Sequence, residues 1–227
     1  MNGNVVVAWE SRCETQEGLF AQRALLGRDV AAVCAVDPLL FRHTLRPFRG
    51  GMDEVVTRQR ELLAADQIEA WADRLRAEGV DVDATVVRGD LVDALIRNSV
   101  ERTSSAIALA SRRPPAVFGD TVARLVRHAH VPLLVLREAR RPGASVQRVL
   151  VPLDLRAGAE RVGPSAVAVA TAHDAEVVLV AAGDPSSTSV RAAIDEAERQ
   201  VRGLASGSPV RYPCVGSLRS SRRKCPT

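Results

Sequence analysis

Two apolar runs near the start of the chain decide its fold class: VVVAWE at Val5–Glu10 and DVAAVCAVDP at Asp29–Pro38. Each run is short and almost wholly apolar, which is typical of a strand buried on both faces of a parallel sheet. The Asp37-Pro38 pair ends the second run, because proline has no N–H to donate to a neighbouring strand. A segment with helical character lies between the runs and ends near Leu26. This order predicts a strand–helix–strand unit.

The segments up to residue 138 continue the alternation of helix and strand patterns. We expect further strands at Val82–Val87, Ala106–Leu109 and Val131–Leu136. We expect helices over Met52–Glu78, from an Asp90 cap to about Glu101, and over Thr121–His128. The apolar face of the first of these helices is predicted to carry Leu63, Ile68, Trp71 and Leu75. Five strands separated by helices predict a doubly wound parallel α/β sheet.

A second set of segments repeats the first. VLVPLD at 149–154 matches the first run, and DAEVVLVAAGDP at 174–185 matches the second. An acid, Glu10 or Asp154, ends the first strand of each set, and an Asp-Pro pair ends the second strand. The agreement in spacing predicts a duplication. We therefore expect a complete domain at 1–138, a linker at 139–145, a partial second copy at 146–215 and a basic, disordered tail at 216–227.

The partial copy is predicted to stop early. A helix at Ser189–Leu204 and a third strand at Pro209–Val215 follow its second strand, and nothing corresponds to Ala106–Leu136.

Composition excludes several classes of protein. The chain is 46% hydrophobic and 3% aromatic, so its core must be aliphatic. Its net charge is +4, but residues 205–227 carry five positive charges and no acid, which leaves −1 for the remainder. The basicity therefore belongs to the tail, and we expect no nucleic-acid partner. Its four cysteines form no C-x-x-C pair, and no secretory signal or membrane-length apolar run is visible, so we expect a cytoplasmic protein without membrane contact.

Several of these features together resemble the universal stress protein family. They are the acid Glu10 after the first strand, the Gly89-Asp90 turn, and VPLLVLR at Val131–Arg137. Residues 4–137 resemble the whole domain of this family. Residues 146–215 resemble the first half of that domain. The resemblance implies the strand order 3-2-1-4-5 and pairing of domains through the last strand, here Val131–Leu136. Because the partial copy lacks its own last strand, we expect a homodimer formed by that edge.

The resemblance also implies where a nucleotide would bind. ATP-binding members of the family carry a Gly-x-x-Gly loop after the fourth strand and a Gly-Ser/Thr pair at the next helix start, where backbone N–H groups meet phosphate. Here Ala110 and Arg113 replace the loop glycines, Pro114-Pro115 removes two donors, and Asp120 adds a negative charge. An arginine such as Arg113 would offer phosphate a charged contact instead. The candidate residues are Ala8, Trp9, Glu10, Val36, Ala110, Arg113, Gly119, Asp120 and Thr121.

No catalytic motif is visible. No serine lies in a Gly-x-Ser-x-Gly turn, and His128 and His130 lack further metal ligands nearby, so interaction with a helix C-terminus is the favoured interpretation. We therefore expect a non-catalytic stress-response protein that acts through dimerisation and protein contacts, with no catalytic residues, metal or cofactor. Two alternatives stay open. One is an ATP-binding sensor, with or without weak ATPase activity, and the other is a regulatory module for a transporter or kinase partner.

Overall fold

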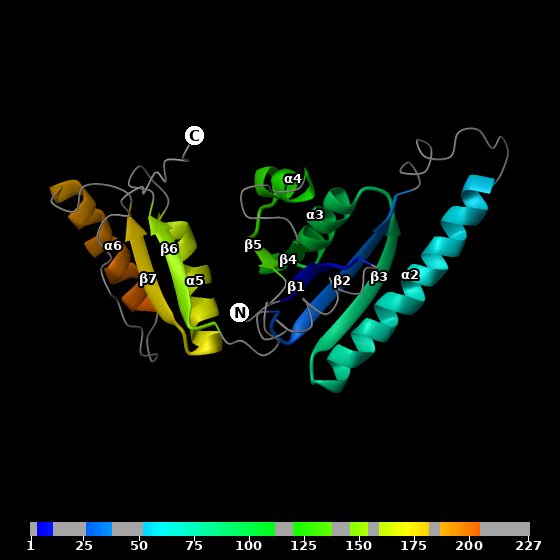
Figure 1. Cartoon of the computed structure of the whole chain (residues 1–227), viewed down its shortest axis with the longest axis horizontal. Helices are drawn as coiled ribbons and strands as arrows, with labels where there is room; N and C mark the ends of the chain where they lie inside the picture. Colours follow the sequence, from blue (N-terminus) through cyan, green and yellow to red (C-terminus); the bar gives the residue numbers. More distant parts are fainter. Residues whose placement is uncertain are drawn as a thin grey trace, which may run out of the picture. The chain divides into compact units, whose positions relative to one another are not determined.

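The computed structural model of the chain describes residues 4–10, 26–37, 52–111, 120–137, 146–153, 159–181 and 187–204. The chain divides into two compact units, residues 1–144 and 145–227, and each is described by itself (Figure 1). Among the described residues, no helix is both long enough and apolar enough to cross a bilayer. The limits predicted for the domains, linker and tail stay predictions.

The first unit is built on a parallel sheet of five strands. The strands are β1 (Val5–Ala8), β2 (Asp29–Val36), β3 (Asp81–Arg88), β4 (Ala106–Ser111) and β5 (Leu133–Arg137). Their order is β3-β2-β1-β4-β5, and every neighbouring pair is parallel. The predicted fold class and strand order are therefore confirmed. The central strand β1 is wholly buried, which explains why its sequence is an unbroken apolar run.

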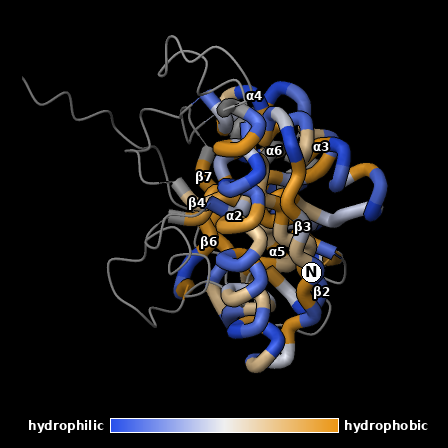
Figure 2. Tube along the Cα trace, turned by 90° about the vertical axis from the view of Figure 1, so that its right-hand side faces the viewer, coloured by the Kyte–Doolittle hydropathy of each residue, from blue (hydrophilic) through white to orange (hydrophobic). Residues whose placement is uncertain are grey.

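Helices cover both faces of this sheet. Helices α3 (Leu91–Glu101) and α4 (Asp120–His128) pack on the face that carries Val6, Ala8 and Val33, whereas α2 (Met52–Ala77) lies on the other side against β2 and β3 (Figure 1). Figure 2 shows hydrophobic and hydrophilic residues alternating along the turns of α2, as a helix with one buried face requires.

The predicted apolar face of α2 was wrong at one position. Leu63 is 53% exposed, whereas Ala64, Ile68, Trp71 and Leu75 are buried. Ala64 lies four residues before Ile68 and so shares its side of the helix, while Leu63 is rotated by about one residue out of that stripe. The smaller alanine therefore takes the core position. The helix ends two residues before Gly79, which has the left-handed φ of +82° predicted for a stop.

The fifth strand begins later than predicted. It starts at Leu133 and not at Val131, because Pro132 has no N–H for the ladder with β4. The carbonyl of Pro132 still accepts a hydrogen bond of 2.9 Å from the N–H of Ile107. The other predicted elements that fall within the described residues of this unit differ by one or two residues at their ends. The helical segment predicted between the first two strands lies outside the described residues.

The second unit contains a two-stranded parallel sheet. Strands β6 (Arg148–Leu153) and β7 (Glu176–Ala181) pair, and helices α5 (Ala159–His173) and α6 (Thr188–Leu204) share a core with them. The face of β6 that carries Leu150 points away from that core, and Leu150 is 66% exposed. The third strand predicted at Pro209–Val215 lies outside the described residues.

Candidate functional site

The strands of a parallel sheet end at one edge, and most of the predicted nucleotide residues lie there. Ala8 ends β1 opposite Val33 of β2 and Leu109 of β4, so the next two residues, Trp9 and Glu10, project beyond the centre of the sheet. Val36 ends β2 opposite Arg88, and Ala110 pairs with Leu136 of β5 near the end of β4. Arg113 and Gly119 lie outside the described residues.

Trp9 is held rigidly at this edge. Its backbone N–H donates a 2.9 Å hydrogen bond to the carbonyl of Val33, and its side chain is only 1% exposed. Within the described structure the indole Nε1 is buried without a hydrogen-bond partner. A buried indole N–H normally finds an acceptor, so this donor stands out.

Glu10 acts electrostatically on the neighbouring strand. Its charge adds to the effect of burial on Cys34, and together burial and Glu10 raise the pKa of the Cys34 thiol to about 11. At neutral pH this thiol is therefore protonated, and it is not a nucleophile. Cys34 fills a core position, as its place in an apolar run predicted.

Helix α4 begins with an acidic residue. Asp120 is its exposed first residue and Thr121 its half-buried second. Asp120 is one of three carboxylates whose charges raise the pKa of the Arg124 guanidinium, together with Asp90 and Asp93. These carboxylates would repel a phosphate that approached Arg124.

A polar cluster in the first unit joins α3 to α4. Asp90 caps α3, because its Oδ1 accepts hydrogen bonds from the N–H groups of Val92 (2.9 Å) and Asp93 (3.1 Å). Arg124 donates from Nη1 to Asp90 Oδ2 at 2.7 Å and from Nη2 to Oδ1 at 2.9 Å. Its Nη2 also lies 3.7 Å from Asp93 Oδ1. These bonds from Arg124 are the main reason that the pKa of Asp90 falls below its ordinary value.

The sequence prediction missed the partner of Asp90. The cap could be predicted because it is local, but Arg124 lies 34 residues further along the chain. The sequence prediction also missed the partners of Arg88 at the end of β3, which are distant in the sequence. Arg88 donates to Glu54 at 2.8 Å and also to Glu61. The hydrogen bond from Arg88 lowers the pKa of Glu61. A surface pocket of about 650 Å³ lies there, lined by Glu54, Val55, Arg58, Gln59, Leu62 and Arg88.

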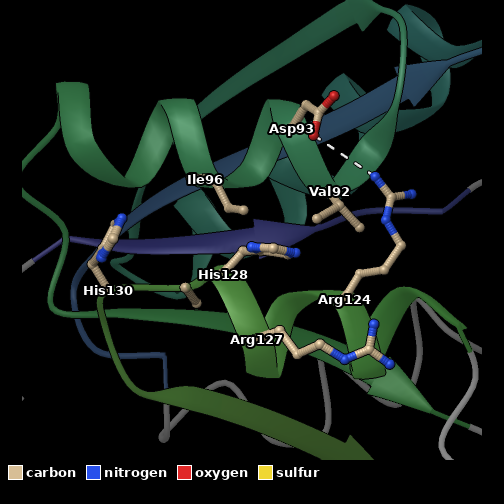
Figure 3. Close-up of a pocket in the computed structure, with 8 residues that line it drawn as sticks. Val92, Asp93, Ile96, Arg124, Arg127, His128 and His130 are labelled. Carbon is tan, nitrogen blue, oxygen red and sulfur yellow. Dashed lines mark ion pairs between the residues drawn. The ribbon is translucent and has the colours of Figure 1, made fainter.

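A second pocket lies between α3 and α4 (Figure 3). It has a volume of about 480 Å³ and is lined by Val92, Asp93, Ile96, Arg124, Arg127, His128, Ala129 and His130. It contains none of the residues predicted for nucleotide binding. Within the described ranges, no three His, Cys, Asp or Glu side chains are grouped so that they could hold a metal ion.

The fold is shared with solved structures. A universal stress protein from Archaeoglobus fulgidus matches with a TM-score of 0.68 and 17% identity, over 93% of this chain and 77% of that one. A hypothetical protein whose biochemical function was assigned from its structure matches with a TM-score of 0.51 and 12% identity, over 61% of this chain and 97% of that one. A universal stress protein in complex with cAMP reaches a TM-score of 0.41 at 15% identity, over 60% of this chain and 97% of that one.

No curated protein matches the sequence. The universal stress protein family, however, matches residues 1–137, which is more than half of the chain and the whole of the five-stranded sheet. The resemblance noted from Glu10, the Gly89-Asp90 turn and the last strand is thereby confirmed: this chain belongs to the universal stress protein family.

Proposed function

We propose that this chain is a non-catalytic stress-response protein that acts as a homodimer and through contacts with protein partners. The observation that carries the proposal is the open edge of β5. In the described structure β5 is the last strand of its sheet and pairs only with β4. Leu133, Leu134 and Val135 on this strand are only partly buried. An unpaired apolar edge strand favours pairing with a second chain.

The geometry of β5 identifies which residues would form that pairing. In a parallel strand the N–H and C=O of one residue point to the same side, and successive residues alternate. The carbonyl of Pro132 faces β4. Leu134 therefore also bonds to β4, while the N–H of Leu133 and of Val135 face the open edge.

The test is the mass of the purified protein in solution, measured by size-exclusion chromatography with light scattering. We expect a dimer for the unaltered chain and a monomer for Val135→Pro, which removes one outward N–H without touching the β4 ladder. Val126→Lys is the control, because Val126 is 65% exposed on α4 and lies off the edge; it should leave the dimer intact. A monomeric unaltered chain, or a dimeric Val135→Pro variant with native tryptophan fluorescence, would refute the proposal.

Adenine-nucleotide binding at the carboxyl edge is the second candidate, and the buried unpartnered Nε1 of Trp9 favours it. A ligand acceptor would satisfy this donor, beside Glu10 where the family resemblance implies the base or ribose. We rank it second because α4 begins with Asp120, and because Arg124 on the same helix already interacts with Asp90, Asp93 and Asp120. Calorimetric titration with ATP tests it. Micromolar binding that is lost in Glu10→Ala would support it, and no heat at millimolar ATP with folded protein would exclude it.

The second unit supports the proposed duplication. Its order β6-α5-β7-α6 is the strand–helix–strand–helix order that the repeat predicts, and its strands are parallel. Among the described residues of the second unit, no strand corresponds to β5. Limited proteolysis that cuts near residues 140–143 and leaves a stable first unit would support this division, whereas equal resistance of both units would count against it.

A further inference from the structure

The pocket between α3 and α4 has an unusual distribution of charge. Its side chains include Arg124, Arg127, His128 and His130 but only one acid, Asp93. Arg124 is engaged by Asp90 and Asp93. Among the residues that the structure describes, none forms an ion pair or hydrogen bond with the other three basic side chains.

The position of these basic groups is set by α4. Arg127 and His128 lie in its last turn, and His130 follows two residues later. Figure 3 shows the His128 ring extending from the end of α4 into the space between the two helices, with Val92 and Ile96 beside it on α3. The Asp93–Arg124 ion pair closes the end of the pocket nearest the start of α3 (Figure 3). In the same view His130 and Arg127 lie on either side of His128, so the three basic side chains line the pocket along its length.

The remaining wall of the pocket is apolar. Val92 is 2% exposed, and Ile96 and Ala129 are half-buried. They belong to or pack against the core that fills this face of the sheet, so the wall is rigid. A volume of about 480 Å³ lies within the range of small-molecule sites. The pocket therefore combines an apolar wall with a basic rim.

We propose that this pocket binds a small organic phosphate monoester. The phosphate lies against Arg127 and His128, which donate hydrogen bonds to its non-ester oxygens. The apolar part of the ester lies against Val92, Ile96 and Ala129. This site is separate from the carboxyl edge and from β5, so it does not depend on the proposed function.

The proposal is tested by calorimetric titration of the full chain with hexyl phosphate. We expect saturable binding that weakens by about tenfold or more in Arg127→Ala and in His128→Ala, since each removes a hydrogen-bond donor to the phosphate. Arg58→Ala is the matched control: it removes one positive charge from α2, on the other face of the sheet, and should leave affinity unchanged. Inorganic phosphate should bind more weakly than hexyl phosphate, and hexanol should not bind.

Two further results locate the site. Glu10→Ala should leave hexyl phosphate binding unchanged, because Glu10 lies at the carboxyl edge, and Val135→Pro should do so because the pocket lies within one chain.

No binding at millimolar hexyl phosphate would overturn the proposal. Equal losses in Arg58→Ala and Arg127→Ala would also overturn it, because they would show attraction by net charge and not a site. Arg127 and His128 are exposed, so both variants should keep native tryptophan fluorescence.

Discussion

Removing the carboxyl group of Asp90 should destabilise the first unit by about 2 kcal/mol, from two separate contributions. Asp90 accepts two backbone hydrogen bonds at the start of α3, and losing such a cap typically costs about 1 kcal/mol. Asp90 also receives two bonds from Arg124, and the side chains of this pair are 37% and 34% exposed. Solvent screens such a pair, so we assign it about 0.5–1 kcal/mol.

The two contributions can be separated by comparing Asp90→Ala with Asp90→Asn. Asparagine keeps an oxygen that can accept the N–H groups of Val92 and Asp93, so it should lose only the charge on the Arg124 pair. We therefore expect Asp90→Asn to cost less than about 1 kcal/mol and Asp90→Ala roughly twice as much. Urea unfolding followed by tryptophan fluorescence measures both, because the chain's two tryptophans, Trp9 and Trp71, are buried in the first unit.

The pH dependence of the same experiment checks the electrostatic part. The pKa of Asp90 is lower in the folded protein, chiefly because of the hydrogen bonds from Arg124. The unfolded chain therefore binds the proton more readily, so the stabilisation is present above the ordinary aspartate pKa and is lost as pH falls through the folded value. The urea midpoints of the unaltered chain and Asp90→Asn should converge below about pH 4. Equal losses in Asp90→Asn and Asp90→Ala, or a difference that persists in acid, would refute this reasoning.

Three other predictions follow from the core. Ile68→Ala should cost about 2–4 kcal/mol and Leu63→Ala less than about 0.5 kcal/mol in the urea assay, because only the first side chain is buried. In a variant that keeps Cys34 as its only cysteine, the native thiol should resist labelling at neutral pH and react in urea. Because its folded pKa is about 11 against an ordinary 9.0, its contribution to stability should be lost as pH rises between these values, and Cys34→Ala should flatten that loss. Trp9→Phe should change stability little, because the Nε1 that it removes has no partner among the described residues, and Trp9→Ala should cost about 3–5 kcal/mol.

The strands of the first unit could be predicted because the apolar signal is local. Val5–Ala8 and Asp29–Val36 are buried almost throughout, so their sequences contain little else than valine, alanine and cysteine. The strand order came from the family resemblance and not from any periodicity. Prediction failed where side-chain size misled it, as at Leu63, or where one missing N–H moved a strand boundary, as at Pro132.

The polar contacts could likewise be predicted only where the partners are close together in the sequence. The Asp90 cap involves residues two and three positions away, and a sequence pattern can represent it. The Asp90–Arg124 pair and the pocket exist only because α3 and α4 pack on the same face of the sheet. His128 and His130 were interpreted as partners of a helix C-terminus, because nothing in the sequence brings α3 next to them.

The charge pattern of α4 favours phosphate binding in the α3–α4 pocket over nucleotide binding at the carboxyl edge of the sheet. A helix that binds phosphate at its N-terminus must leave that end open to an anion, since its N–H groups and dipole supply the attraction. Helix α4 begins instead with Asp120, and Arg124 on the same helix is already bonded to Asp90. The basic residues of α4 that lack such a bond lie in its last turn, where they stabilise the helix against its own dipole and face the α3–α4 pocket. Among the described residues of α4, the basic side chains without a carboxylate partner therefore lie at its end, and the pocket there is the better candidate for binding phosphate.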